Sequence, residues 1–174
     1  GSVCELVRGR SYKRDELVEQ GGLPFLNLKC VSRGGGFRLS GIKRYQGPFK
    51  PMQQTYSGET VIAMTDMTQE RNIVGQAARV PHLDAEFGVI SLDLNRVIPN
   101  PGVDPDYLYT TFRYSAFSRT VKEFANGTNV LHLRPSSIEN HDFVLAPEPL
   151  QQSFGDLIQP ALELADHLQQ QSEL

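Results

Sequence analysis

The sequence predicts an α+β protein: a mainly β globular domain with a few short helices, followed by a long C-terminal helix of coiled-coil character. Three observations predict this class. Short apolar runs separated by glycine and proline turns fill the first half, a proline opens a helix after residue 104, and apolar residues recur in alternating steps of four and three from residue 150. With 174 residues, 39% of them hydrophobic, the chain can bury the core of one domain. We expect that domain over residues 1–149 and the helix over residues 150–174.

The first half is expected to be mainly β, after a short helix over residues 15–20 that is stopped by Gly21 and Gly22. Three consecutive glycines make residues 32–36 a flexible loop, which is either a hairpin end or a segment whose backbone comes close to another group. It is not a Walker loop, because the Lys-Ser/Thr pair that reaches phosphates is missing. Strands are expected at residues 23–31, 37–45, 59–64, 73–80 and 87–94.

Prolines between residues 99 and 105 are expected to break regular structure before a helix begins. Asp104 followed by Pro105 is typical of a helix N-cap with proline at the first helical position. A break at residues 115–118 precedes a second helical segment at 121–125. An Asn-Gly turn and two short strands follow, at residues 126–127, 130–133 and 143–145.

The C-terminal segment has an apolar seam with heptad spacing. A single helix cannot bury such a seam against itself, and its outer face is acidic, so we expect a partner helix. The alternative is that the seam docks on its own domain. Pro160 lies inside the segment, which leaves two shorter helices as an alternative to one long helix. The seam consists of Leu150, Phe154, Leu157, Ala161, Leu164 and Leu168.

Charge is strongly segregated along the chain, although the net charge is only −3. Residues 1–50 contain ten Lys and Arg against four Asp and Glu, whereas residues 135–174 contain seven acids and no base. The basic residues from Lys29 to Lys50 follow one another without an acid between Glu19 and Glu59. Such a stretch is either a solvated face or a surface for an anionic partner such as nucleic acid.

No catalytic residue, metal site or cofactor is predicted. The four histidines are scattered, without a cluster at zinc spacing, and no serine nucleophile motif is present. Asp66 and Glu70 are the nearest approach to a paired carboxylate site, so an enzyme would have to use them with a histidine. Cys4 and Cys30 are expected to be small buried hydrophobes. Neither a membrane span nor a signal peptide is recognisable, so we expect a cytoplasmic protein with no membrane partner.

Three stretches bear a family resemblance: Pro24 to Leu26 entering a strand, Tyr56 to Pro81, and Phe124 to Gln152. The middle stretch consists of an acidic-apolar strand, a polar loop at 65–72 and a glycine re-entering the sheet. The last consists of a small-residue turn at 126–128, a short strand and a proline-bounded strand at 147–152 that ends in a glutamine opening the C-terminal helix. Together they resemble the target recognition domain of type I restriction-modification specificity subunits, over nearly the whole chain.

This resemblance implies a domain without an active site that reads one half of a split DNA target. Residues 1–149 would be the target recognition domain, and residues 150–174 the start of the spacer and dimerisation helix. The implied partners are double-stranded DNA, the modification (methyltransferase) and restriction subunits and, through the helix, a second copy of the chain. The family normally has two recognition domains and this chain has one, so it is either an excised domain or a half-subunit that dimerises.

The residues expected to contact DNA combine phosphate-binding cations with side chains that can read base edges. Amides such as Gln69 and Asn72 suit adenine, and the guanidinium groups suit guanine. The alternative function is a helix-mediated protein scaffold that does not read DNA. The candidates are Arg33, Arg38, Lys43, Arg44, Thr68, Gln69, Arg71 and Asn72, with Asn126 and Thr128 of the small-residue turn.

Overall fold

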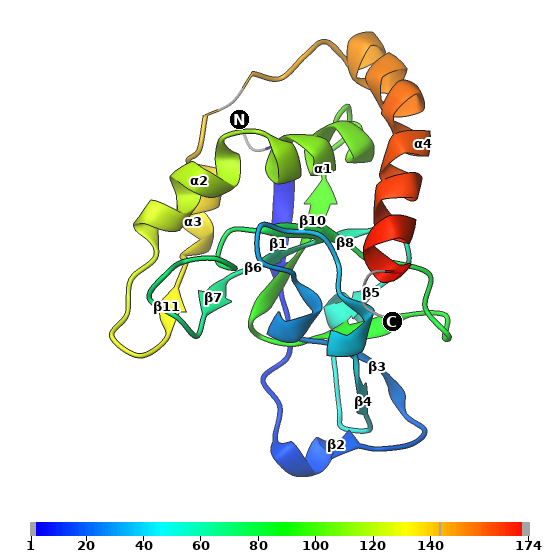
Figure 1. Cartoon of the computed structure of the whole chain (residues 1–174), viewed down its shortest axis with the longest axis vertical. Coiled ribbons are helices and arrows are strands. Elements are labelled where there is room, and N and C mark those ends of the chain that lie inside the picture. Colours follow the sequence, from blue (N-terminus) through cyan, green and yellow to red (C-terminus); the bar gives the residue numbers. More distant parts are fainter. Residues whose placement is uncertain (1–2, 143, 172–174) are drawn as a thin grey trace.

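The computed structural model describes residues 3–142 and 144–171, and it confirms the mixed α+β class (Figure 1). An antiparallel four-stranded sheet has the order β1-β10-β6-β8. Strand β1, which is not among the expected strands, pairs with β10 from Cys4 opposite Pro99 to Arg8 opposite Asn95. The four strands are β1 (Cys4–Arg8), β6 (Thr60–Ala63), β8 (Ala77–Arg79) and β10 (Leu94–Pro99).

A five-stranded sheet has the order β2-β4-β3-β9-β5, and only its β3–β9 pair is parallel. A separate two-stranded ladder joins β7 (Thr65–Asp66) to β11 (Leu131–His132). The strands of the larger sheet are β2 (Leu17–Val18), β3 (Leu23–Leu26), β4 (Lys43–Tyr45), β5 (Gln54–Thr55) and β9 (Gly88–Ile90).

The core lies on both faces of the four-stranded sheet. Successive side chains of a strand point to opposite faces, and in β6 Ile62 packs against the helices whereas Val61 and Ala63 pack toward the five-stranded sheet. The four-stranded sheet is therefore the middle layer between helices and a second sheet. The helices are α1 (Pro105–Tyr114), α2 (Phe117–Val121), α3 (Pro135–Glu139) and α4 (Glu148–Gln171). The short 3-10 helices are η1 (Arg14–Glu16), η2 (Leu28–Cys30), η3 (Leu39–Gly41), η4 (Pro51–Gln53) and η5 (Lys122–Phe124).

The predicted start of α1 is confirmed, because the side chain of Asp104 accepts a hydrogen bond from the backbone N of Tyr107 at 2.8 Å. The break after α1 is confirmed only at residues 115 and 116, because α2 already begins at Phe117 and ends at Val121, where the second helical segment was expected to begin. The C-terminal half also differs from the prediction in two places. Helix α3 was not expected. The strand expected at 143–145 is absent at residues 144 and 145, and residue 143 lies outside the described residues.

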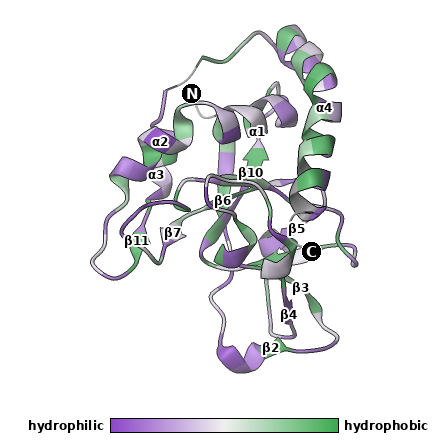
Figure 2. Ribbon diagram, in the orientation of Figure 1, coloured by the Kyte–Doolittle hydropathy of each residue, from purple (hydrophilic) through white to green (hydrophobic). Residues whose placement is uncertain are grey.

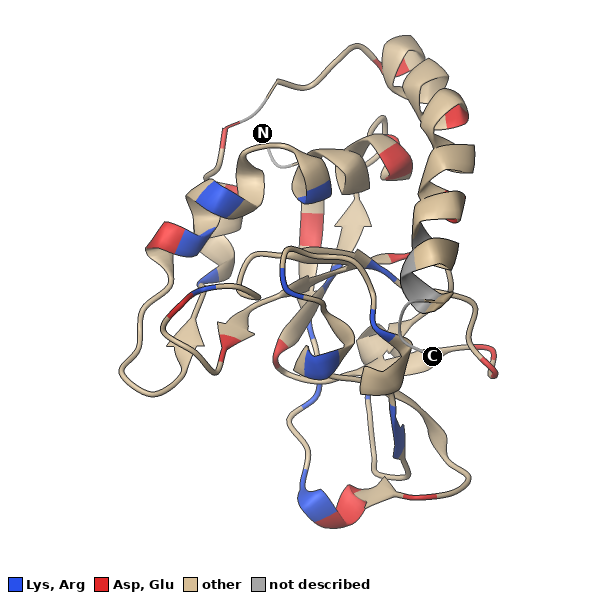
Figure 3. Cartoon of the chain, in the orientation of Figure 1, with Lys and Arg blue, Asp and Glu red and all other residues tan. Residues whose placement is uncertain are grey.

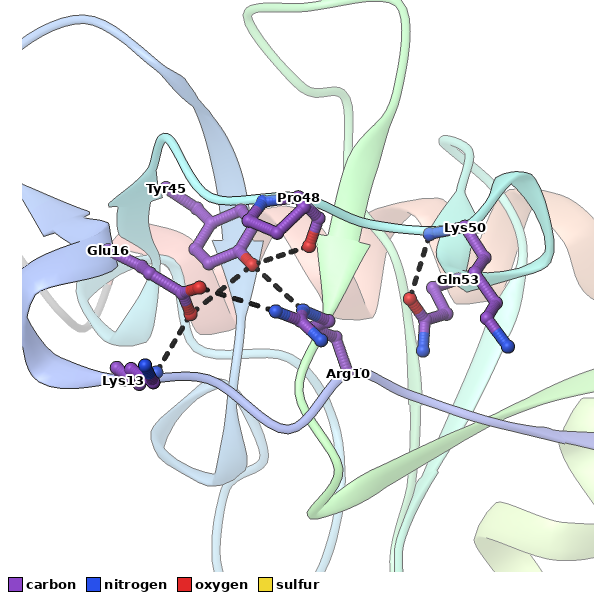
Figure 4. Close-up of polar contacts among 7 residues, drawn as sticks. All are labelled: Arg10, Lys13, Glu16, Tyr45, Pro48, Lys50 and Gln53. Carbon is purple, nitrogen blue, oxygen red and sulfur yellow. Dashed lines mark hydrogen bonds and ion pairs between the residues drawn. The ribbon is translucent and has the colours of Figure 1, made fainter.

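The prediction of a helix over residues 15–20 is also wrong. The single turn η1 ends at Glu16, and Leu17 and Val18 instead form β2 against Tyr45 and Arg44. A polar network fixes this arrangement: Arg10 donates from Nε to the Tyr45 hydroxyl at 3.0 Å, and that hydroxyl donates to the Pro48 carbonyl at 2.8 Å (Figure 4). Tertiary pairing therefore outweighs the weak local preference for helix.

Several expected strands are shorter than the sequence suggested, for a local reason. Strand β3 ends at Leu26 because the Asn27 side chain accepts a hydrogen bond from the backbone N of Lys29 at 2.9 Å and caps η2. Both cysteines are buried and unlinked, as expected. Burial, with a smaller effect of Glu139, raises the pKa of Cys4 to about 11, so this thiol stays protonated at neutral pH.

Helix α4 runs through Pro160 as one helix and docks on the domain with a face that the heptad pattern did not indicate. Gln151 and Leu162 are 1% and 3% exposed, and Ile158 packs against the helix-side core. Gln151 accepts a hydrogen bond from the Asp104 backbone N at 3.0 Å and donates to the Ala146 carbonyl at 2.7 Å. A Cβ atom at Gly155 would lie only 2.9 Å from Oδ1 of Asp104, so the helix can approach α1 this closely only with glycine there.

The predicted seam lies one position away from this docking face and is largely exposed. Leu150, Leu157, Leu164 and Leu168 have exposed fractions of 62%, 78%, 58% and 55%. Phe154 is the exception, because its ring packs edge-on against Tyr107 with centroids 5.8 Å apart. The alternative in which the seam docks on its own domain is therefore wrong for the leucines. Hydrophobic residues recur along α4 in Figure 2.

Candidate nucleic-acid interface

A loop of polar residues, 67–73 (the polar loop), leaves the end of β7. Asp66 is fully buried and connects both ends of this loop. Its Oδ1 accepts hydrogen bonds from the backbone N and the Oγ1 of Thr68, both at 2.9 Å. Its Oδ2 accepts from the backbone N of Ile73 at 2.8 Å and of Val74 at 3.3 Å. The carboxylate therefore determines the conformation of the loop from inside.

The same contacts set the charge of Asp66. Burial on its own would raise the pKa, because a carboxylate loses hydration when it is buried. The hydrogen bonds from Ile73, Thr68 and Val74 together outweigh burial, so the pKa of Asp66 lies below its ordinary value. Asp66 is thus an ionised structural anchor, a role that its sequence pairing with Glu70 did not indicate. The signal that could have found it is the Asp-x-Thr spacing of an Asx turn.

The polar loop contacts the small-residue turn at residues 126–130. Gln69 donates from Nε2 to the Thr128 carbonyl at 2.9 Å. Asn126 and His132 close the turn by exchanging backbone hydrogen bonds at 3.0 and 2.9 Å. Two motifs that are far apart in the sequence therefore belong to one surface: the polar loop with Gln69, and the small-residue turn with Asn126 and Thr128.

Arg71 has an unusual backbone conformation. Its φ of 56° lies in the left-handed region, and among the described residues it is the only non-glycine residue with a positive φ. Residues in such conformations persist where their surroundings hold them, often at functional sites. The Arg71 side chain forms an ion pair with Glu123 of η5, with Nη1 2.9 Å from Oε2. The neighbouring Asn72 donates from Nδ2 to Glu70 at 2.7 Å.

The glycine loop at residues 32–36 lies against the polar loop. Gly34 donates from its backbone N to the Asn72 carbonyl at 3.2 Å, and Gly36 donates to the Ala77 carbonyl at 2.9 Å. A Cβ atom on Gly35 would lie 2.8 Å from Cδ of Arg113 and 3.0 Å from the Ala77 carbonyl oxygen. The loop is both a hairpin end, closed by a bridge between residues 31 and 37, and a segment of close backbone approach. It presents Arg33 at the surface beside the polar loop.

The structure separates the remaining basic candidates from this surface. Lys43 and Arg44 lie on β4, which Figure 1 shows well apart from β7 and β11, and Arg38 precedes η3. Lys and Arg are spread over many elements in Figure 3, and α4 has none. The basic stretch of the sequence is therefore not one patch. The residues brought together are Arg33, Thr68, Gln69, Arg71, Asn72, Asn126 and Thr128.

Arg44 is already paired. Two of its guanidinium nitrogens contact the two carboxylate oxygens of Asp84, and this contact raises the pKa of Arg44 and lowers that of Asp84. Lys43 is exposed and has no side-chain hydrogen bond or ion pair to any described residue. Of the two adjacent cations, only Lys43 therefore offers an uncompensated charge.

The fold is that of the specificity subunits of type I restriction-modification systems. A chain solved in work on complex assembly and conformational transition of the type I R-M system superposes with a TM-score of 0.59 at 17% identity, over 98% of this chain and 40% of that one. The type I S subunit from M. genitalium gives a TM-score of 0.59 at 13% identity, over 94% of this chain and 38% of that one. The HsdS subunit from Thermoanaerobacter tengcongensis gives a TM-score of 0.61 at 18% identity, over 98% of this chain and 39% of that one.

The chain spans about two fifths of the length of these structures. No protein-family model matches the sequence, and no curated protein matches it. The family resemblance inferred from three short stretches is thus confirmed at the level of the fold. Within the described residues, no helix combines the length and apolar character that a membrane span requires.

Proposed function

We propose that this chain recognises a specific sequence in double-stranded DNA as part of the specificity subunit of a type I restriction-modification system. It would read one half of a bipartite target and direct the methyltransferase and endonuclease subunits, supplying no catalytic group itself. One observation carries the proposal: within this fold, buried Asp66 holds a surface loop that presents Gln69, Arg71 and Asn72 beside Arg33. A restriction-modification partner also implies the cytoplasm, where the DNA is.

The contacts of these side chains in the free domain suit such a role. Gln69 and Arg71 bond to Thr128 and Glu123 at the surface, where a contact of this kind contributes about 0–1 kcal/mol. Base edges in the major groove can therefore replace them at little cost. The backbone of the loop, in contrast, is held by its hydrogen bonds to the buried Asp66 and need not rearrange, which favours affinity.

The proposal is tested by selecting bound sequences from a random pool of duplexes with the purified chain. Enrichment of a short asymmetric motif is the expected result, and it would identify the half-site. Recovery of duplexes without any shared motif would contradict sequence-specific recognition by this chain.

Substitution of the polar loop should reduce specific binding selectively. We expect Gln69→Ala or Arg71→Ala to lose about 1–3 kcal/mol against the selected duplex and almost nothing against random duplexes, because base-edge contacts exist only on the right sequence. Glu123→Gln is the matched control, since it frees Arg71 without shortening it and should not weaken binding. Equal losses on both kinds of duplex would show that these side chains only position the DNA.

Lys43 should contribute to affinity without affecting specificity. Lys43→Ala is expected to weaken binding to every duplex alike and to reduce the slope of log affinity against log salt by about 0.9, the value for one phosphate contact. Asp84→Asn is the second variant of this test. It removes the carboxylate that neutralises Arg44, so it should strengthen binding to every duplex. Unchanged affinity of both variants at low salt would exclude β4 from the interface.

The exposed leucines of α4 support a second role for the same chain, in assembly. An apolar stripe on a helix without basic residues is typical of a surface that a partner covers. We propose that it packs against a matching helix, from a second recognition domain or a second copy, with the modification and restriction subunits alongside. If the chain is instead a protein scaffold that does not read DNA, this apolar stripe is the only one of its proposed surfaces that functions.

A further inference from the structure

A small cavity of about 220 Å³ lies at the other end of the β7–β11 ladder from the polar loop. Its lining includes three basic residues from segments far apart in the sequence: Arg8 ends β1, His132 belongs to β11 and Arg134 follows it. No acidic residue lines it, although the chain has more acids than bases. This concentration of positive charge is not visible in the sequence.

The three basic side chains have no partner among the residues that the structure describes. Arg8, His132 and Arg134 are exposed, and none forms a side-chain hydrogen bond or ion pair with any described residue. Other arginines of the domain are engaged, as Arg79 is with Asp106 and Arg96 with Glu59. The donors around this cavity are therefore available to a ligand.

A buried amide completes the lining. Asn95 on β10 is 2% exposed as a residue and lines the cavity, and its side chain makes no hydrogen bond to a described residue, so its amide N–H groups can donate to a ligand there. It lies directly opposite Arg8 in the β1–β10 pair, so both side chains project from the same face of the sheet. Asp93, the nearest acid in the sequence, is engaged by Thr65 at 3.0 Å and does not line the cavity.

We propose that Arg8, Asn95, His132 and Arg134 form a pocket for one backbone phosphate of the DNA that the polar loop reads. Guanidinium, imidazole and amide N–H groups together suit the several acceptor oxygens of a phosphate. Thr65 pairs with His132 on the ladder, so the pocket is about two residues, roughly 7 Å, from the start of the polar loop. Along the axis of B-DNA that distance covers about two nucleotides of one strand, at roughly 3.4 Å each. The inference rests on the proposed DNA recognition.

The first arm of the test uses inorganic phosphate as the probe, observed by NMR of the arginine and histidine side chains. Saturable shifts of the Arg8 and His132 signals are expected in the native chain, and the shift of the His132 signal should be lost in the Arg8→Gln/Arg134→Gln variant. Arg14→Gln, which removes an exposed charge from η1, is the control and should leave the shifts unchanged. Absence of saturable shifts in the native chain would overturn the pocket, whether or not the chain binds DNA.

The second arm decides whether the phosphate belongs to DNA. In the Arg8→Gln/Arg134→Gln variant, affinity should fall about equally for the selected and the random duplexes, and the salt slope should decrease by about 0.9. Arg14→Gln should change neither. A variant that loses the phosphate shifts but keeps the affinity and slope of the native chain would contradict a DNA-backbone site. If the native chain itself enriches no shared motif from the random duplexes, that result would instead contradict the proposed function.

Discussion

Replacing Asp66 with asparagine should lower the free energy of unfolding by about 3 kcal/mol and abolish sequence-specific DNA binding. The buried carboxylate accepts four hydrogen bonds, from Thr68, Ile73 and Val74. An amide of the same shape retains one acceptor oxygen and turns a donor toward backbone N–H groups, and lost hydrogen bonds to a charged group cost about 1.5–3 kcal/mol each. Urea denaturation and binding to the selected duplex measure the two effects.

Glu70→Gln is the matched stability control, because it removes the same charge from an exposed position of the same loop. It should change the free energy of unfolding by no more than about 0.5 kcal/mol. An Asp66→Asn variant as stable as this control, with unaltered DNA selection, would show that the hydrogen bonds of Asp66 do not hold the loop.

Acid should remove the contribution of Asp66. Its pKa in the folded chain lies below the ordinary value, so the stabilisation is fully present above the pKa of the unfolded chain, about 4, and is lost as the pH falls through the lower folded value. The difference in free energy of unfolding between the native chain and Asp66→Asn should therefore shrink below about pH 4. A difference that stays constant down to about pH 2 would contradict this linkage.

Adjacent faces of α4 should respond to mutation in opposite ways. Leu162→Ala should destabilise the domain by about 2–4 kcal/mol, because Leu162 is 3% exposed in the helix-side core and its truncation leaves a cavity. Leu164→Glu should leave stability almost unchanged, since that side chain is 58% exposed, but should disrupt self-association and assembly with the modification subunit. Denaturation measures the change in stability, and sedimentation measures the change in self-association.

The seam prediction fails under a specific combination of results. If the native chain and Leu164→Glu are both monomers, and a full subunit carrying the substitution still assembles with the modification subunit, then the exposed leucines of α4 serve no partner. If Leu164→Glu destabilises the domain as strongly as Leu162→Ala, then both faces of the helix belong to its own core.

Sequence patterns were informative where the structure depends on local chemistry. Asp104 and Pro105 begin a helix because an N-cap and a preset proline φ act within a few residues. The glycine loop and the polar loop were recognised because glycine and polar runs exclude regular packed structure. In contrast, the helix expected at residues 15–20 is replaced by the end of a 3-10 turn and the two-residue strand β2, since Leu17 and Val18 pair with residues far along the chain.

Apolar periodicity and turn residues are local properties of the chain, so the α+β class and the long C-terminal helix with its apolar seam could be predicted from the sequence, while three short stretches carried the resemblance to specificity subunits. Which face of α4 docks depends on tertiary contacts. Gln151 and Gly155 lie on the face that packs against α1 and its N-cap, but neither residue is hydrophobic, so the apolar pattern of the sequence does not reveal this face. The tertiary structure also decided which cations are compensated, as Arg44 is by Asp84. Pairing of charges depends on which strands and loops become neighbours, and that depends on contacts between segments far apart in the sequence.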